Sequence, residues 1–476
     1  MLSRLERQGA PLGPLLAGPD DSRVRRDLRY CVLDGVFFSI MVGIGETFFP
    51  AFAVYLGLGG VVAGLIATLP VVLGALIQLL APALLRRVNS YPRFVGWCAV
   101  VQAGMYVPLI LTAVLATPLP SGATAFERAP LTIVLLATIT VYWAALLASA
   151  SSWITMASHV VPRRIDAAYF SQRNRWLHLT TLGGILGHGA ILAAFSGTIG
   201  YAIAFGVAMA CRLLSALYLF HYSEPTTRPR DEDRVGVRVF LRRFASGLAG
   251  RMFFAIAVMN IAAYVAWPYV NPYFLRVLSL DKVQMFEHFA PAGSVFAWLV
   301  AAGYAGRFAV LPAAARWIEL KGIGFVLSWA AIGLLLTGPL YLLPVWLGGQ
   351  ELAAGSGAFI ACVLIPLFAV QFVAGAAWGA WDLCVLLFSM RGVSPGERTG
   401  LLTMFAVPNE ACKTLGSVGG GAVLDALDRG SSAYGGVFLI GTAARLLALV
   451  AVLRVVLPSR STQPGSHESG DLTSSS

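Results

Sequence analysis

Several ionisable side chains lie inside long apolar stretches of this chain, where a charge is costly. Glu46 follows an apolar run that begins at Tyr30. At 1.5 Å per residue it would lie roughly 24 Å along a helix. Ionisable residues buried in this way usually bind a substrate, a proton or another charge. We interpret Glu46 as a candidate proton-coupling group, and the alternative is a carboxylate paired for packing.

A second group of ionisable residues falls late in the chain. Asp382 lies in the apolar stretch 357–389, and Glu410 and Lys413 are three residues apart in the stretch 401–427. That spacing places Glu410 and Lys413 on one helix face, where they can form a local ion pair. We predict an intramembrane charge network of these three residues, with Asp382 as a second proton-coupling candidate. A static pair between Asp382 and Lys413 is the alternative.

Polar and aromatic residues share the faces of two apolar stretches. Asn260, Tyr264 and Trp267 recur at i, i+4 and i+7, which is the spacing of one helix face. Aromatic rings beside amides suit an amphipathic organic ligand, and packing or anchoring at the membrane interface is the alternative. The candidate residues for a substrate cavity are Phe49, Asn260, Tyr264, Trp267, Gln371 and Trp378.

A third group of residues is suited to gating. Asp34 lies one turn inside the first apolar stretch, and Arg86 and Arg87 follow the second. His188 interrupts the glycine-rich run GGILGHG at residues 183–189, where a helix would flex or pack closely. The histidines lack the spacing of metal ligands, so we expect no metal site and no cofactor.

The elements that position these residues must cross a membrane. The chain is 58% hydrophobic and 12% charged, against about 25% charged residues in soluble domains. In a bilayer the backbone must satisfy its own hydrogen bonds, so the apolar stretches are expected to be helices. We predict twelve transmembrane helices, at residues 30–56, 61–84, 94–116, 130–160, 170–195, 198–222, 250–275, 285–306, 323–346, 357–389, 401–427 and 434–457.

The basic residues set the orientation of these helices. Most of the 34 Lys and Arg lie in the tails and in the loops between even and odd helices, so both termini are predicted to be cytoplasmic. The net charge of +11 is interpreted as topology and contact with lipid headgroups, not as nucleic-acid binding. The predicted organisation is a cytoplasmic tail (1–29), a six-helix bundle (30–222), a cytoplasmic linker (223–249), a second bundle (250–457) and a disordered tail (458–476).

The two predicted bundles carry an internal repeat. Residues 162–217 align without a gap with residues 395–450, and the best run pairs Arg212-Leu213-Leu214 with Arg445-Leu446-Leu447. Because both halves carry it, this arginine is interpreted as part of the scaffold, bonded to carbonyls or extended toward the cytoplasm. A weaker match pairs Pro50 with Pro272 and Phe52 with Phe274. Parallel six-helix repeats with a site between them are common in secondary transporters.

Together these features resemble the major facilitator superfamily. The stretch PRRIDAAYFSQRNRW, before GGILGHG, is similar to the loop between the fourth and fifth helices of that family. The resemblance implies that helices 1, 4, 7 and 10 surround a central cavity. The loops ALLRRVNSYPR and GYAGRFAVLPAAARW, after helices 2 and 8, lack the family's Asp, and Gly187-His188 replaces the Gly-Pro of drug/proton antiporters.

The predicted function is therefore secondary transport across a bacterial inner membrane. The expected partners are a small, amphipathic organic solute, a proton and the lipid bilayer, with the protein as a monomer. The chain lacks the GxxxxGK[ST] motif of an ATP-driven pump and the acidic or His clusters of a membrane enzyme, so we expect no enzyme activity. A non-transporting sensor or assembly factor of the same fold is the alternative.

Overall fold

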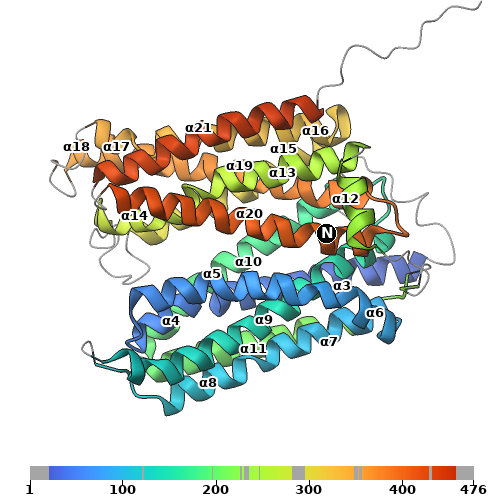
Figure 1. The fold of residues 1–476 in the computed structure, drawn as a ribbon, viewed down its shortest axis with the longest axis horizontal. Coiled ribbons are helices and arrows are strands. Elements are labelled where there is room, and N and C mark those ends of the chain that lie inside the picture. Colours follow the sequence, from blue (N-terminus) through green and yellow to red (C-terminus); the bar gives the residue numbers. More distant parts are fainter. Residues whose placement is uncertain are drawn as a thin grey trace, which may run out of the picture.

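Helices make up the regular structure of the described part of this chain (Figure 1). The computed structural model describes residues 21–120, 123–195, 197–225, 228–229, 235–245, 247–280, 295–347, 352, 356–427 and 431–456. The predicted C-terminal tail, most of the N-terminal tail and part of the linker lie outside these residues. The first helix begins at Asp21, ahead of the predicted start at residue 30.

The helices form two groups that follow each other along the chain (Figure 1). The first group contains α3 (Asp21–Ile44), η1 (Glu46–Phe48), α4 (Phe49–Tyr55), α5 (Gly59–Ile77), η2 (Gln78–Leu80), α6 (Ala81–Val88), α7 (Tyr91–Gly104), α8 (Tyr106–Leu115), α9 (Ala125–Val160), α10 (Asp166–Ala194) and α11 (Thr198–Phe220). The second group follows the short helix α12 (Val237–Ala245). It contains α13 (Gly247–Tyr264), η3 (Trp267–Tyr269), α14 (Val270–Arg276), α15 (Val295–Lys321), α16 (Ile323–Leu340), α17 (Leu343–Trp346), α18 (Gly357–Phe359), η5 (Ile360–Leu364), α19 (Ile365–Arg391), α20 (Arg398–Ala426) and α21 (Ser431–Val456). We call these groups the first half and the second half.

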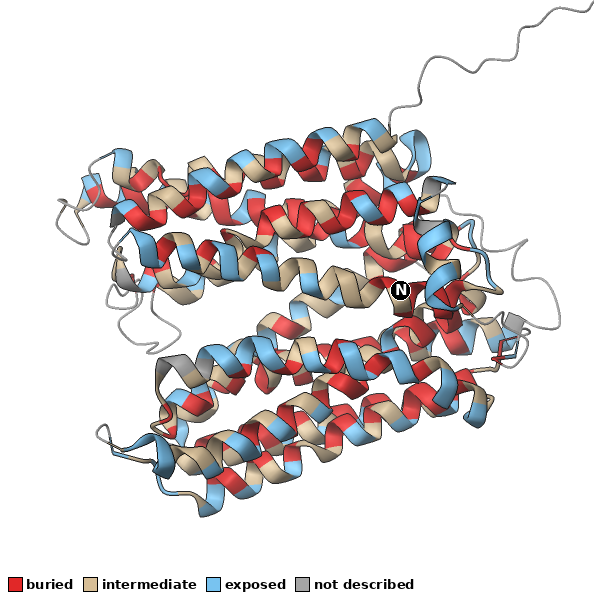
Figure 2. Ribbon diagram, in the orientation of Figure 1, coloured by how far each residue is buried: buried red, intermediate tan, exposed pale blue. Residues whose placement is uncertain are grey.

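The chain is a multi-pass membrane protein. Within the described residues, 11 helical segments are long and apolar enough to cross a bilayer. Another long helix, α20, has 29 residues and carries Arg398, Glu410, Lys413 and Asp425. Exposed residues lie along the outer helices (Figure 2). Large apolar side chains such as Leu115 and Leu447 are among the exposed residues. Exposed apolar surface of this extent suits a lipid environment rather than water.

The eighth predicted helix is displaced in the structure. The sequence predicted a helix at 285–306 and a cytoplasmic loop beyond it, and residues 281–294 lie outside the described part. The structure has one continuous helix, α15, that runs to Lys321 with Pro312 inside it. The loop assignment of GYAGRFAVLPAAARW was therefore wrong. Arg307 lies within the helix, where a carboxylate partner described below compensates its charge.

The hydrophobic cores show where the two halves meet. One buried cluster joins both halves and includes Tyr91 and Tyr169 of the first half and Phe253 and Phe388 of the second. It lies toward the end where α3 begins and α21 ends, at the right of Figure 1, which we call the closed end. Toward the opposite end each half has its own cluster. The halves are thus packed together at the closed end and have separate cores away from it.

The separate clusters have matching compositions. Phe52 contacts Tyr201 and Phe205 in the first half, at ring-centroid distances of 5.0 and 5.1 Å. In the second half, Tyr273 lies 5.8 Å from Tyr434 and 5.2 Å from Phe438. Tyr201 and Phe205 are the residues that the sequence repeat pairs with Tyr434 and Phe438. The repeat therefore aligns residues that occupy corresponding places in the two halves.

The first helix of each half is interrupted at a corresponding place. In the first half α3 ends at Ile44, and the 3-10 turn η1 precedes α4, which has Pro50 in its first turn. In the second half α13 ends at Tyr264, and the 3-10 turn η3 precedes α14, with Pro272 near its start. A proline early in a helix fixes the backbone without removing an internal hydrogen bond, so it supports a fresh start there. Glu46 and Trp267 lie at these two breaks.

Candidate functional site

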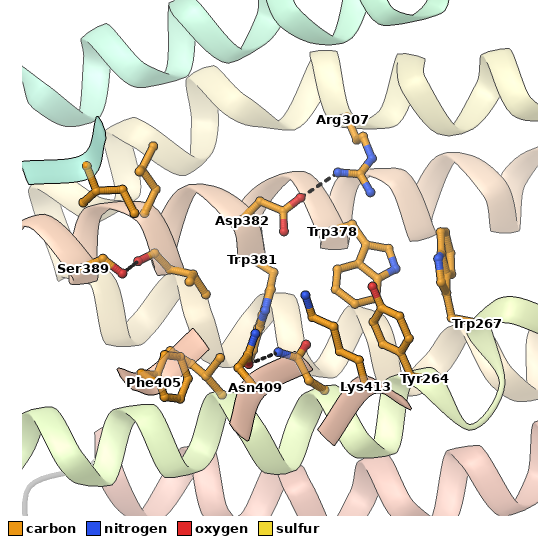
Figure 3. A pocket seen from close by; sticks show the side chains of 15 residues that line it. Tyr264, Trp267, Arg307, Trp378, Trp381, Asp382, Ser389, Phe405, Asn409 and Lys413 are labelled. Carbon is orange, nitrogen blue, oxygen red and sulfur yellow. Dashed lines mark hydrogen bonds and ion pairs between the residues drawn. The ribbon is translucent and has the colours of Figure 1, made fainter. Parts of the chain in front are cut away.

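A cavity of about 390 Å³ lies on the side of the second half that faces the first. Residues from α13, η3, α15, α19 and α20 line it, with Ile154 of α9 from the first half (Figure 3). We call it the aromatic cavity. Its lining is Ile154, Ile256, Asn260, Tyr264, Trp267, Arg307, Trp378, Trp381, Asp382, Val385, Leu386, Ser389, Phe405, Asn409 and Lys413. The structure thus brings together six of the predicted site residues, namely Asn260, Tyr264, Trp267, Trp378, Asp382 and Lys413.

An ion pair crosses the wall of the aromatic cavity between two helices. Arg307 Nη1 of α15 lies 2.7 Å from Asp382 Oδ2 of α19 (Figure 3). The Asp382 side chain is 50% exposed, so its carboxylate borders the cavity instead of being buried in the helix contact. The alternative pairing of Asp382 with Lys413 is not observed. A carboxylate with this exposure can exchange its arginine partner for a ligand.

A second polar group enters the aromatic cavity from α20. Lys413 Nζ lies 2.7 Å from Glu410 Oε1, which is the local pair that the i,i+3 spacing predicted. Asn260 Nδ2 of α13 donates to Asn409 Oδ1 at 2.7 Å, and Asn409 donates in turn to Glu410. The bond between the two asparagines links α13 to α20 beside the cavity (Figure 3). It joins Asn260 to the charged pair.

Three tryptophans, a tyrosine and a phenylalanine give the aromatic cavity its rings. The rings of Trp267 and Trp378 meet edge to face at 5.5 Å. Lys413 Nζ lies 5.8 Å from the centre of the Tyr264 ring, within the range of a cation–π contact. A wall of rings interrupted by charged groups can bind a flat or apolar ligand that also carries polar groups.

A second cavity, of about 260 Å³, lies on the first-half side. We call it the arginine cavity. Its lining is Asp34, Phe38, Val95, Leu146, Ser149, Ala150, Trp153, Ile154, Arg173, Leu177, Arg212, Leu219 and Leu386. Asp34 is the predicted gate residue that lines it. Asp34 Oδ1 accepts a hydrogen bond from Ser215 at 2.8 Å, and Arg212 donates to Ser215 and to Gln102. Arg212 is therefore bonded to side chains, not to the carbonyls that the scaffold interpretation expected.

The counterpart arginine of the second half fits the scaffold interpretation. Arg445 Nη1 donates to the carbonyl of Leu334 and to Thr337, and Nη2 donates to the carbonyl of Ala263. These bonds connect α21 with α16 and α13. Arg445 lines neither the aromatic nor the arginine cavity. The two duplicated arginines thus have different surroundings in the two halves.

Glu46 lies at the helix break and outside both cavities. Tyr142 of α9 donates a hydrogen bond of 2.6 Å to Glu46 Oε2. Phe49 is buried in the neighbouring aromatic cluster, with its ring 5.2 Å from that of Tyr142. His188 is buried beside the same break, where its Nδ1 lies 2.6 Å from the Ile44 carbonyl and its ring stacks on Phe48. These groups form one compact cluster around η1.

The remaining predicted residues lie apart from the cavities. Gln371 is buried and accepts a hydrogen bond of 2.8 Å from Tyr341. Arg86 and Arg87 lie in the last turn of α6, at the closed end, and Arg87 is exposed. Within the described residues, no three His, Cys, Asp or Glu side chains are grouped so that they could hold a metal ion.

Comparison with solved structures identifies the fold. A bacterial homologue of the iron transporter ferroportin, in an outward-facing state, aligns over 90% of this chain and 99% of its own, with 13% identity and a TM-score of 0.65. The E. coli fucose:proton symporter FucP, a major facilitator superfamily transporter, aligns over 90% and 99%, with 14% identity and a TM-score of 0.61. The chain has the major facilitator superfamily fold. No family model matches its sequence, and no curated protein does.

The closed end of this major facilitator fold is held by polar contacts between the halves. Ser151 and Thr403 share a hydrogen bond of 2.7 Å, and Thr155 and Thr399 one of 2.9 Å, all between α9 and α20. Arg398 of α20 also donates to Ser158 of α9. Small hydroxyl side chains let these two helices approach closely, and the hydrogen bonds satisfy them away from water.

Sequence reasoning missed several residues of the site. Arg307 was assigned to the loop after the predicted helix 285–306, and the structure places it inside α15. Asn409 and Trp381 also line the cavity. They directly precede the predicted residues Glu410 and Asp382, and the helical period could have placed them on the cavity side. Asp166 lies in the stretch PRRIDAAYFSQRNRW, and its pairing with Arg391 carried no local signal.

Proposed function

We propose that this protein is a secondary active transporter that works by alternating access. The observation that carries the proposal is the arrangement of the cavities. Each lies where one half faces the other, and Ile154 of the first half and Leu386 of the second line both of them. The halves share a core at the closed end and have separate cores away from it. Rocking of the halves would expose such a site to each side in turn.

The proposed topology has twelve spans, with α20 as the span beyond the 11 apolar ones. Its polar residues include Asn409, Lys413 and Thr403, and they face the cavity or the other half, which explains its lower hydropathy. Basic residues gather in the connections at the closed end, so we place that end and both termini in the cytoplasm. The halves then correspond to 30–222 and 250–457, joined by a cytoplasmic linker at 223–249.

This orientation implies an outward-facing state in a bacterial inner membrane. Two of the solved structures with this fold, the ferroportin homologue and FucP, are in outward-facing states. We propose that the protein acts as a monomer, because the cavities lie between the two halves of one chain. Substrate would reach them from outside, and opening of the closed end would release it to the cytoplasm, or the reverse.

We propose a small amphipathic organic molecule as the solute. The tryptophans of the aromatic cavity supply apolar surface, while Asp382, Arg307 and Lys413 supply charge at its edge. The solved structures with this fold include a fucose symporter, a xylose symporter, a nucleoside transporter and a homologue of an iron transporter. These structures support a transport function. Their sequences are 12% to 14% identical to this chain, so their substrates are not assigned to it.

Proton coupling is assigned to Glu46, with Asp382 as the second candidate. Glu46 sits at the break in the first helix and is held by Tyr142, so protonation would alter a contact between η1 and α9. A helix break is a place where a change of charge can be converted into movement, since the backbone is not tied by a continuous ladder of hydrogen bonds. Asp382 could couple a proton to ligand binding through its exchange with Arg307.

The test is flux in proteoliposomes with a pH-sensitive dye inside and an imposed pH gradient. A panel of organic acids, amines, nucleosides and sugars is added outside, and wild type is compared with Glu46→Gln. Glu127→Gln is the matched control, because Glu127 is fully outside the cavities in a capping box with Thr124, where glutamine serves equally well. We expect ligand-dependent proton flux in wild type and in the control, and its loss in Glu46→Gln.

Other outcomes separate the alternatives. Ligand flux that is independent of pH in wild type would leave a transporter and overturn the proton coupling. Silence across the panel from folded protein would favour a non-transporting sensor or assembly factor.

A further inference from the structure

The arginine cavity has a charge imbalance. Arg173 and Arg212 line it with 6% and 4% of their surface exposed, and Asp34 is the acidic residue of its lining. A buried charge is unfavourable unless an opposite charge and hydrogen bonds compensate it. Two guanidinium groups therefore share one carboxylate in a space of about 260 Å³.

The contacts of the two arginines leave this imbalance in place. Arg173 Nη2 lies 3.9 Å from Asp34 Oδ2, beyond hydrogen-bond distance. The hydrogen bonds of Arg212 go to the neutral side chains of Gln102 and Ser215. Glu46, the next carboxylate along the first helix, attracts Arg212 from outside the cavity, where it is bonded to Tyr142 and does not line the space.

Both guanidinium groups are held in place while some of their donors remain available. Arg173 donates through Nε to the Cys31 carbonyl, and its guanidinium lies 4.6 Å from the Trp153 ring. Arg212 lies 4.9 Å from the Phe38 ring. A guanidinium carries five N–H donors, and the bonds recorded among the described residues use one from Arg173 and two from Arg212. The rest suit a carboxylate or phosphate oxygen.

The arginine cavity borders the aromatic cavity, because Ile154 and Leu386 line both. Movement of these two side chains would join the two spaces. One ligand could then place an anionic group between Arg173 and Arg212 and an apolar body against Trp378 and Trp381. The Arg445 site of the second half differs, because Arg445 lines neither of the two cavities.

We propose that the arginine cavity is an anion-binding subsite and that the substrate is an organic anion with an aromatic or similar apolar body. This inference rests on the proposed function, because it names the substrate class of the same chamber. Arg173 and Arg212 bind the anionic group, and Asp34 positions Arg212 through Ser215. The tryptophans of the aromatic cavity bind the apolar part.

The experiment compares three probes of one shape and different charge. Benzoate, benzamide and benzylammonium are titrated into the purified full chain in detergent by isothermal calorimetry. We expect benzoate to bind at least about tenfold more tightly than benzamide, the effect of one charge-assisted hydrogen bond, and benzylammonium to bind most weakly. Arg173→Gln and Arg212→Gln should each abolish the preference for benzoate, while Arg173→Lys should keep part of it.

Two further variants separate a binding role from a structural one. Arg445→Gln is the matched control, because it removes an equally buried arginine from outside the cavities and should keep the preference. Ala150→Leu fills the arginine cavity without removing a charge, and should weaken benzoate in a protein of normal stability. Ala150→Leu therefore still tests the subsite if an arginine variant does not fold.

Several results would overturn the anion subsite. These are equal binding of benzoate and benzamide, absence of binding by all three probes at millimolar concentration, or an unchanged preference in folded Arg173→Gln and Ala150→Leu. Transport of neutral or cationic solutes in the proteoliposome screen would leave the proposed function standing and remove this inference. Charge-selective binding without any flux would support the anion subsite and overturn the proposed transport function.

Discussion

Arg391 of α19 and Asp166 of α10 form an ion pair that joins the two halves at the closed end. Arg391 Nε donates to Asp166 Oδ2 at 2.8 Å, and Nη2 contacts Oδ1. Asp166 is buried, with 5% of its side chain exposed, against 30% for Arg391. A two-point contact between arginine and carboxylate fixes orientation as well as distance. The pair supplies an acidic–basic contact between the halves at this end, although the stretches ALLRRVNSYPR and GYAGRFAVLPAAARW contain no aspartate.

Removing this ion pair should favour opening of the closed end. For Asp166→Asn we expect a loss of about 1 kcal/mol, which is roughly a fivefold shift in population toward the state open at this end. Spin labels at Arg87 and Leu320, both exposed and in different halves, should report a longer distance by double electron–electron resonance. The charge-reversed double variant Asp166→Arg/Arg391→Asp should restore part of the wild-type distribution. An unchanged distribution in Asp166→Asn would show that the hydroxyl contacts alone hold this end.

The Arg307–Asp382 pair should matter more for transport than for stability. Because the Asp382 side chain is half exposed, Asp382→Asn should change the free energy of unfolding by less than about 1 kcal/mol. It should nevertheless reduce substrate flux strongly, since Arg307 would stand uncompensated beside the ligand. Thermal unfolding and proteoliposome flux, measured on the same preparation, give the two quantities. A large loss of stability with normal flux in the folded fraction would make the pair structural.

The hydroxyl group of Tyr142 should affect proton coupling. Tyr142→Phe removes the 2.6 Å hydrogen bond to Glu46 without changing the ring that packs against Phe49. We expect a stability cost of about 1 kcal/mol and a changed pH dependence of flux, as in Glu46→Gln. Tyr201→Phe is the control, because Tyr201 belongs to the same aromatic cluster and does not bond Glu46. Identical pH profiles for Tyr142→Phe and Tyr201→Phe would contradict the role of Glu46.

The sequence predicted the helices well where apolar runs are uninterrupted by charge. The span 130–160 is observed as Ala125–Val160, and 323–346 is covered by α16 and α17. The error at α15 has a physical cause. Arg307 is acceptable inside a span because Asp382, far away in sequence, compensates its charge. The hydropathy of a sequence contains no information about a partner on another helix. The unpaired-looking arginine was therefore assigned to a loop.

The same limit applies to the candidate site. Residues on one face of one helix, such as Asn260, Tyr264 and Trp267, were grouped by their periodicity, and they do line one cavity. Pairings between helices had no such signal. Gln371 bonds Tyr341, and Arg212 lines a cavity instead of bonding carbonyls as Arg445 does. Side chains of one type at repeated positions can thus have different neighbours in the two halves.

Close helix contacts give a further prediction in which neighbouring glycines serve as controls. Where α3 crosses α10, a Cβ on Gly184 would lie 2.8 Å from the Ile40 carbonyl and 3.0 Å from the Gly43 Cα. Where the residue that follows α13 meets α20, a Cβ on Gly420 would collide with the Val265 carbonyl. The neighbouring Gly183 and Gly419 have no described atom within 4 Å of such a Cβ. Glycine is required at the two crossings because backbone meets backbone there.

Alanine substitutions should therefore separate the two members of each glycine pair. Gly184→Ala and Gly420→Ala should destabilise the protein by about 1–3 kcal/mol, because the helices must move apart. Gly183→Ala and Gly419→Ala should be neutral or stabilising by up to about 1 kcal/mol, since alanine favours a helix over glycine. Thermal unfolding of the four variants in one detergent gives the comparison. Equal effects within a pair would mean that the crossings are looser than the structure has them.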